Sequence, residues 1–230
     1  TTSGGEDEYY IFDLNENVER TAVTYQNRYG IRISGDLYMA KDLDKNTVHP
    51  ALIIGPPYGG VKEQGPGVYA NELAQRGFIV LTFDPSFNGE SGGEPRHVSS
   101  PDIFTEDFSA GVDYLGTLEY VNREGIGAVG ICGSGGFALA AAQVDTRIQA
   151  VATASLFDVS VSGAGLDREQ WVETMETLAK QRWSDVDNGE PQYLPTYPEE
   201  PTEEIPEELE GIWAEFYSFY RRSMVHPEAK

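Results

Sequence analysis

The sequence has a single cysteine, few basic residues and no long apolar run. One cysteine allows no disulfide within the chain, which leaves Cys132 free for chemistry. The chain has 16 lysine and arginine residues against 38 aspartate and glutamate residues, and its net charge of -22 argues against binding nucleic acid or an anionic membrane through a basic surface. No apolar stretch approaches the roughly 18 residues of a membrane span, and residues 1–8 lack the pattern of a signal peptide. We therefore expect a cytoplasmic protein without nucleic-acid or membrane partners.

A hydrophobic content of 40% and an aromatic content of 11% are enough for one sizeable core in 230 residues. We expect an N-terminal extension at residues 1–17, a core domain at residues 18–159 and an acidic helical cap or insertion at residues 160–230. The acidic run in the last segment is typical of a solvated surface.

Alternating β-like and helical patterns predict an α/β fold. Residues 18–25 and 31–40 alternate around a turn, which favours an antiparallel hairpin. Buried strands are expected at residues 49–54, 78–83, 126–131 and 149–154. Because helical patterns separate these strands, we expect a mostly parallel sheet with right-handed crossovers.

The segment at residues 126–142, IGAVGICGSGGFALAAA, indicates a buried strand, a sharp turn and a helix of small residues. The spacing Gly130-x-Cys132-x-Ser134 fits a nucleophile elbow, a strained turn that lifts one side chain above the sheet. The amide hydrogens at the start of the following helix favour a thiolate, which is the nucleophilic form of cysteine. Cys132 is therefore the candidate nucleophile.

Three other interpretations use the same segment. Ser134 could be the nucleophile of a small-x-Ser-x-Gly string. The spacing Gly133-x-Gly135-x-x-Ala138 also resembles a dinucleotide fingerprint, with Asp158 as a ribose ligand, although that motif normally occupies the first βα turn of its fold. The third interpretation is an inert buried cysteine in a tight turn.

The loop after the strand at residues 49–54 is a candidate for half of an oxyanion hole. Pro56 and Pro57 have no amide hydrogen, so the first donor in this loop is Tyr58. The second expected donor is the amide of Gly133, the residue after the nucleophile. The alternative is that the paired prolines and glycines only form a rigid turn.

Three strings together carry a family resemblance. They are GGVKEQ at residues 59–64, FDPSFNGES at residues 83–91 and GICGSGG at residues 130–136. With them the chain resembles the α/β-hydrolase superfamily, and more closely its YcjY-like branch, which is related to dienelactone hydrolases that use cysteine. The resemblance spans residues 31–158. It implies a Cys-His-Asp triad acting on an ester, thioester or lactone, with Tyr58 and Gly133 as oxyanion donors.

The acid and the general base are harder to assign. Asp158 follows the strand at residues 149–154 and is a candidate acid, although a turn or helix-cap role is the more usual one for an aspartate there. His49 precedes a parallel strand and so lies at the wrong end of the sheet, whereas His97 is on the correct side and His226 follows a helix. The superfamily places its acid and histidine after two further strands. We therefore expect these groups from a C-terminal segment or a second chain.

The last segment predicts the substrate class. Apolar residues at helical spacing indicate two helices, one containing Trp171, Met175 and Leu178 and the other containing Leu209, Trp213, Phe216 and Tyr220. As an apolar cap in an acidic chain they favour neutral, apolar or aromatic acyl substrates. No cofactor or metal is expected, since the three histidines and one cysteine show no ligand spacing. Alternative functions are carbon-carbon bond hydrolysis and a non-catalytic binding or assembly subunit with an incomplete triad.

Overall fold

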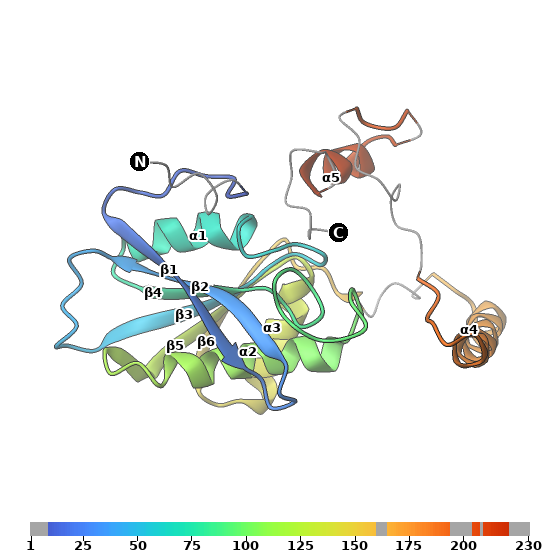
Figure 1. Ribbon diagram of the computed structural model, residues 1–230, viewed down its shortest axis with the longest axis horizontal. Helices are drawn as coiled ribbons and strands as arrows, with labels where there is room; N and C mark the ends of the chain where they lie inside the picture. The colour runs from blue at the N-terminus through green and yellow to red at the C-terminus, as the bar shows by residue number, and fades with distance from the viewer. Residues whose placement is uncertain (1–8, 160–164, 194–203, 208, 221–230) are drawn as a thin grey trace.

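The computed structural model describes residues 9–159, 165–193, 204–207 and 209–220 (Figure 1). Its sheet has six strands, which are β1 (Val18–Gln26), β2 (Arg32–Ala40), β3 (His49–Gly55), β4 (Ile79–Phe83), β5 (Val121–Ile131) and β6 (Ile148–Ala154). The helices in these ranges are α1 (Gly65–Ala74), α2 (Pro101–Leu115), α3 (Gly133–Val144), α4 (Arg168–Asn188) and α5 (Ile212–Tyr220). Within the described ranges, no helix combines the length and apolar character that crossing a membrane requires.

The first two strands form the expected hairpin. The side chain of Asn27 in the turn accepts the backbone N–H groups of Tyr29 and Ile31, each at 3.0 Å. Gly30 has a φ of 76°, a left-handed conformation that favours glycine. The strand order is β1-β2-β4-β3-β5-β6, in which β1, β2 and β4 are antiparallel neighbours and β4, β3, β5 and β6 are parallel. The mostly parallel sheet with an antiparallel hairpin is therefore confirmed.

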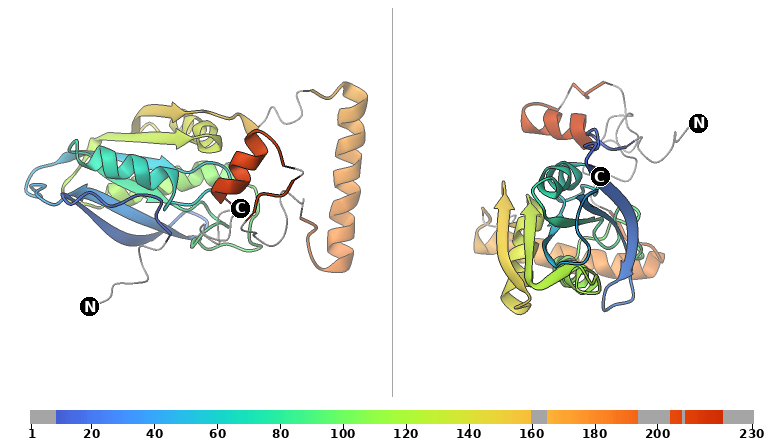
Figure 2. Two further views of the ribbon diagram at one scale, coloured as in Figure 1. Left: turned by 90° about the horizontal axis from the view of Figure 1, so that it is seen from above. Right: turned by 90° about the vertical axis from the view of Figure 1, so that its left-hand side faces the viewer.

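Helices cover both faces of the sheet (Figures 1 and 2). On one face, Ala70 and Ala74 of α1 pack in a buried cluster with Ile54 and Val80 of the sheet. The other face carries α2 and α3, whose buried residues include Phe104, Phe108, Val112, Leu115, Phe137 and Ala141. Parallel strands that are buried on both faces need apolar side chains in both directions, which explains their nearly continuous apolar runs.

The strand order reverses between β3 and β5. The chain leaves β3 through α1 toward β4, and it leaves β5 through α3 toward β6. β3 and β5 are direct neighbours, with Gly55 opposite Gly130 at their carboxyl ends. In open parallel sheets, ligands bind beyond the carboxyl ends of the strands at such a reversal. The segments after β3 and β5 are therefore where a functional site is expected.

α4 and α5 lie on the side of the sheet where the parallel strands end, and α4 stands apart from the sheet (Figures 1 and 2). α4 begins with a capping box, in which the side chains of Asp167 and Gln170 each accept the other residue's backbone N–H. No residue of α4 is buried, and Trp171 and Met175 are 47% and 40% exposed. The cap role of this segment and its boundaries stay predictions.

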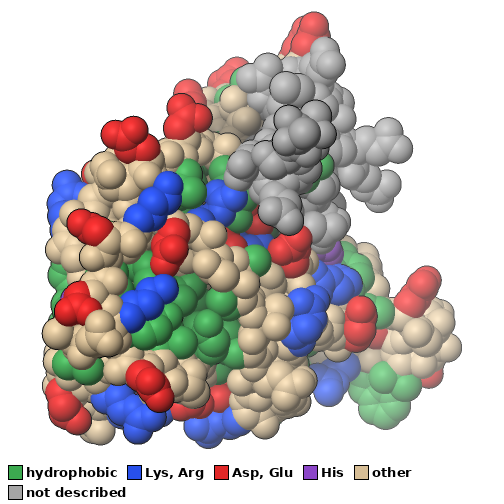
Figure 3. Space-filling model, turned by 60° about the vertical axis from the view of Figure 1, so that its left-hand side comes forward, with side chains coloured by type: hydrophobic (Ala, Val, Ile, Leu, Met, Phe, Trp, Pro, Cys, Tyr) green, Lys and Arg blue, Asp and Glu red, His purple; other side chains and the backbone are tan. Residues whose placement is uncertain are grey.

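Acidic side chains are not the only charged groups on the surface, although the net charge is negative. On the face shown in Figure 3, lysine and arginine side chains lie among aspartate and glutamate side chains, and hydrophobic side chains gather between them.

Candidate active site

Cys132 occupies a strained turn between β5 and α3. Its φ of 52° and ψ of -117° lie in a region that residues with a side chain rarely adopt, and such strain is typical of functional positions. The backbone holds this conformation from both sides. The N–H of Cys132 donates to Ala154 at 2.9 Å, and its carbonyl accepts the N–H of Gly135 at 3.0 Å. The turn therefore has the geometry of a nucleophile elbow.

Glycine at position 130 is what allows this turn to be so tight. A Cβ at Gly130 would lie 2.2 Å from the carbonyl oxygen of Ser134 and 2.5 Å from the Cα of Gly135. The end of β5 and the first turn of α3 are thus in direct backbone contact. The segment follows the third parallel strand along the chain, after β3 and β4, and not the first, where a dinucleotide fingerprint normally lies.

Cys132 and Ser134 differ in access. Ser134 is 3% exposed, and a Cβ on Gly55 of the neighbouring strand would lie 2.8 Å from its Oγ. Its hydroxyl therefore faces the end of β3, inside the fold. Cys132 is half-buried at the tip of the turn.

The loop after β3 brings the Tyr58 amide to the elbow. A Cβ on Gly133 would lie 3.1 Å from the Cβ of Tyr58 and 3.5 Å from its backbone nitrogen. Among the described residues, no acceptor is found for the N–H of either Tyr58 or Gly133. The Tyr58 ring packs edge-on against Phe104, with ring centroids 6.5 Å apart. The backbone nitrogen of Tyr58 therefore lies close to Gly133, the residue after Cys132, and the role of the two amides as oxyanion donors stays a prediction.

Asp158 lies on the exposed segment that follows β6. The residue before it, Phe157, donates its N–H to the carbonyl oxygen of Cys132 at 3.0 Å. This bond ties the backbone of the segment to the elbow, so Asp158 is at the same edge of the sheet as Cys132. Its role as the acid stays a prediction.

The histidines are placed at different ends of the sheet. His49 begins β3, and its Nε2 lies 2.8 Å from the carbonyl oxygen of Asp44, at the end opposite to the elbow. His97 lies in the loop after β4, on the elbow side, where its N–H donates to Phe87 at 2.9 Å and its φ is 60°. His226 lies outside the described residues.

A group of charged residues in the loops after β3 and β4, three of them buried, was not expected from the sequence. We call Lys62, Glu63, Asp84 and Glu90 the Lys62 cluster. The Nζ of Lys62 contacts the Oε1 of Glu63, the Oδ2 of Asp84 at 3.2 Å and the Oε2 of Glu90 at 2.7 Å. Lys62 is 2% exposed and Asp84 is fully buried. The sequence did carry a signal, because the aspartate of FDPSF directly follows a buried strand and KE of GGVKEQ lies in the loop after another.

The same three carboxylates have an arrangement that could hold a metal ion, since each offers an oxygen and these oxygens lie within 4.8 Å of one another. An internal cation already occupies this position, because the Lys62 ammonium contacts all three. Burial disfavours that ammonium, yet Asp84 and Glu63 together raise the pKa of Lys62 well above its usual value. The cluster therefore fits a lysine better than a metal.

Two buried carboxyls have raised pKa values. Burial and the negative charge of Asp84 raise the pKa of Glu63 to about 7, against the opposing effect of Lys62. Burial also raises the pKa of Asp107 to about 6, although its hydrogen bonds from Ser86 and Asn27 oppose the shift. Both carboxyls thus bind protons more tightly in the folded chain than in the unfolded chain.

We expect the free energy of unfolding to fall as the pH rises from about 4 to about 7, because the folded state releases protons there that the unfolded state has already lost. A carboxyl whose pKa is higher by one in the folded than in the unfolded chain changes the free energy of unfolding by at most about 1.4 kcal/mol over this pH range. Urea midpoints at about pH 5 and about pH 7.5 measure the effect, and Glu63→Gln and Asp107→Asn should each reduce the difference. A midpoint that is equal or higher at the higher pH would contradict this expectation.

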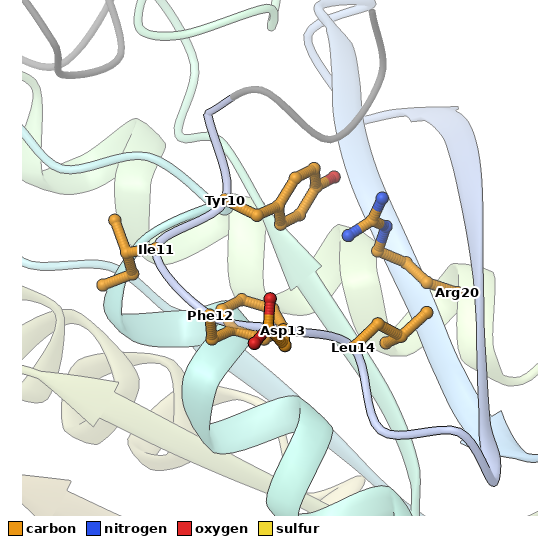
Figure 4. A pocket seen from close by; sticks show the side chains of 6 residues that line it. All are labelled: Tyr10, Ile11, Phe12, Asp13, Leu14 and Arg20. Carbon is orange, nitrogen blue, oxygen red and sulfur yellow. The ribbon is translucent and has the colours of Figure 1, made fainter. Parts of the chain in front are cut away.

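A separate cavity of about 430 Å³ lies between the N-terminal segment and β1 (Figure 4). The Tyr10 hydroxyl there donates to the Oδ2 of Asp36 at 2.6 Å, and the Arg20 guanidinium lies 3.4 Å from the centre of the Tyr10 ring. Because β2, β4 and β3 separate β1 from β5, this cavity is not part of the elbow site.

Known proteins share both the sequence and the fold of this chain. PA2218 of Pseudomonas aeruginosa is 50% identical over 221 residues, which cover 94% of this chain and 57% of that protein. YcjY of Escherichia coli is 36% identical over 207 residues, which cover 86% of this chain and 66% of that protein. The chain therefore spans less than two thirds of either curated sequence. No protein-family model matches the chain.

Solved structures of PA2218 and of an α/β hydrolase share the fold of this chain. The crystal structure of PA2218 matches with a TM-score of 0.86 and 43% identity, covering 98% of this chain and 70% of that one. The α/β hydrolase GrgF of a Penicillium species matches with a TM-score of 0.67 and 27% identity, covering 79% of this chain and 60% of that one. Together with the elbow between β5 and α3, these similarities show that the chain belongs to the α/β-hydrolase superfamily.

Proposed function

We propose that this chain carries the nucleophile and oxyanion hole of a cysteine-dependent acyl hydrolase that acts on a carboxylic ester, thioester or lactone. The observation that carries the proposal is the strained elbow, which holds Cys132 beside the amides of Tyr58 and Gly133. The buried hydroxyl of Ser134 supports the cysteine over the serine.

The reaction begins when a general base takes the proton of the Cys132 thiol and the sulfur attacks the acyl carbonyl carbon. A carbon-sulfur bond forms, and the carbonyl electron pair moves to oxygen, where the Tyr58 and Gly133 amides stabilise the negative charge. The intermediate collapses, and the alcohol or thiol leaves with the proton from the base. Water then hydrolyses the acyl-cysteine by the same steps and restores the thiol.

The remaining parts of the triad belong to the same proposal. The base is a histidine supplied by a further segment of chain or by a second chain, and Asp158 is the candidate acid that orients it. The hydrogen bond between Phe157 and Cys132 supports this choice of acid, because it keeps the segment that carries Asp158 at the elbow.

The substrate in this proposal is neutral and apolar or aromatic. A net charge of -22 disfavours anionic substrates, and exposed aromatic residues of α4 and α5 such as Trp171 and Trp213 offer apolar contacts on the side where the strands end. Acyl transfer to an acceptor other than water would use the same first half-reaction. The 30% identity to a Penicillium protein named polyketide transferase GrgF favours it as the second candidate.

Alkylation of the native protein tests the nucleophile directly. We expect iodoacetamide to modify Cys132 roughly tenfold faster than a cysteine peptide at neutral pH, because the amides at the start of α3 stabilise the attacking thiolate. Intact mass gives the extent of modification without ambiguity, since the chain has one cysteine. With the segment or chain that supplies the histidine present, loss of p-nitrophenyl ester turnover should follow the modification. Labelling that occurs only in denaturant would instead favour the inert buried cysteine.

A further inference from the structure

We propose that Lys62 is a positioning residue for the oxyanion hole. Its ammonium fixes the loop after β3, which carries the Tyr58 amide, to the loop after β4. This inference rests on the proposed function, since it concerns how the Tyr58 donor is held beside Cys132.

The contacts of Lys62 join two loops that are far apart in the sequence. An ammonium group has three hydrogen-bond donors, and in the Lys62 cluster these face three carboxylates. Glu63 belongs to the loop after β3, Asp84 follows the end of β4, and Glu90 belongs to the loop after β4. The Lys62 ammonium thus contacts carboxylates from both loops.

Backbone hydrogen bonds strengthen this connection at Asp84. The backbone N–H of Lys62 donates to the Oδ1 of Asp84 at 2.8 Å, and the N–H of Glu90 donates to its Oδ2 at 2.9 Å. The Ser91 hydroxyl donates to the Asp84 carbonyl at 2.7 Å and accepts the N–H of Ser34 at 2.9 Å. Asp84 therefore anchors both loops to β2.

The path from Lys62 back to Tyr58 is short, with three residues between them. The N–H of Gly60 donates to Pro57 at 2.8 Å and closes a turn around Tyr58. Val61 and Gln64 are linked twice: the Val61 N–H donates to the Gln64 side chain at 3.3 Å, and the Gln64 N–H donates to the Val61 carbonyl at 3.2 Å. Because only Gly59, Gly60 and Val61 lie between Tyr58 and Lys62, and hydrogen bonds hold Gly60 and Val61, we expect a displacement of Lys62 to reach the Tyr58 amide.

The position of that amide matters for acyl transfer more than for other reactions of the same thiol. Removing an oxyanion donor costs about 10²–10³-fold in rate, and productive geometry must be kept within about 0.5 Å. Alkylation by iodoacetamide displaces iodide from a saturated carbon and forms no oxyanion. Misplacing the Tyr58 amide should thus slow acylation of Cys132 and leave its alkylation unchanged.

The test compares these two reactions of Cys132 in Lys62→Met. Acylation is followed as the first turnover of p-nitrophenyl acetate, in which the carbon-sulfur bond forms and p-nitrophenolate leaves. We expect acylation to slow by about 10- to 100-fold, less than for complete loss of a donor, and alkylation to change by less than about threefold. Lys45→Met is the matched control, because Lys45 pairs with Glu19 at an exposed site between β2 and β3. It should change neither rate.

Lys62→Met leaves buried carboxylates without their cation and can therefore prevent folding. Glu90→Gln is a second variant that keeps the test decisive in that case. The Glu90 side chain is 59% exposed, so its loss strands no buried charge. We expect a several-fold slower acylation with unchanged alkylation. Acylation at the wild-type rate in the folded variants, or an equal fall in both rates, would overturn the inference. Absence of Cys132-dependent acylation in the wild-type protein, with the segment or chain that supplies its histidine present, would instead overturn the proposed function, and the inference with it.

Discussion

Cys132→Ala is expected to lower p-nitrophenyl ester turnover at least about 10³-fold in the protein that has its histidine-supplying segment or chain, whereas Ser134→Ala changes it by less than about threefold. Alanine at position 132 removes the nucleophile and keeps the small side chain that the turn accepts. Ser134 is 3% exposed and faces Gly55, so its hydroxyl is out of reach of a substrate above the elbow. Steady-state kinetics of the two purified variants beside the wild type measure the contrast.

A third variant, Cys132→Ser, distinguishes the reactivity of the thiol from the size of the side chain. A hydroxyl is far less ionised than a thiol at neutral pH, so turnover should again be lost by about 10²-fold or more even though the side chain is nearly the same size. The free energies of unfolding of all three variants should agree with that of the wild type within about 1 kcal/mol. An active Cys132→Ser together with an inactive Ser134→Ala would assign the nucleophile to Ser134.

The sequence predicted the part of the fold that depends on local patterns. The hairpin follows from alternation around Asn27 and Gly30, and the elbow follows from glycine and small residues at fixed distances from Cys132. These features are determined by the backbone conformations that individual residues can adopt. The parallel sheet follows in turn from the alternation of strands and helices.

Other features depend on partners that are distant in the sequence. β5 begins at Val121, five residues before the apolar run at residue 126, because its first residue pairs with His49 of β3 even though the residues between are polar. The Lys62 cluster joins residues that are up to 28 positions apart. A buried lysine is rare unless it is paired, and pairing becomes visible only when the strands lie side by side. The general base is a similar case, since neither His97 nor His226 is placed by a strand pattern.

Gly130→Ala is expected to destabilise the fold by about 3 kcal/mol or more, which is a large share of the 5–15 kcal/mol typical of a domain. The added Cβ would lie 2.2 Å from the carbonyl oxygen of Ser134 and 2.5 Å from both the nitrogen and the Cα of Gly135. These are backbone atoms of the first turn of α3, so no side-chain rotation can relieve the contact. The helix must move away from β5, and that movement also displaces Cys132.

Gly136→Ala is the matched control, because it adds the same methyl group six positions later, within α3. The nearest atom to its Cβ is the carbonyl oxygen of Phe157 at 3.8 Å, an ordinary contact, and its backbone is already helical. Alanine in a helix is favoured over glycine by about 0.5–1 kcal/mol, so this variant should be as stable as the wild type or slightly more stable.

Urea unfolding followed by far-UV circular dichroism compares the two variants, and iodoacetamide labelling of Cys132 reports the elbow itself. We expect Gly130→Ala to have a lower midpoint and an altered labelling rate, and Gly136→Ala to match the wild type in labelling. A Gly130→Ala protein with unchanged midpoint and labelling would mean that β5 and α3 are not in backbone contact. Since the elbow depends on that contact, the geometry assigned to Cys132 would then be wrong as well.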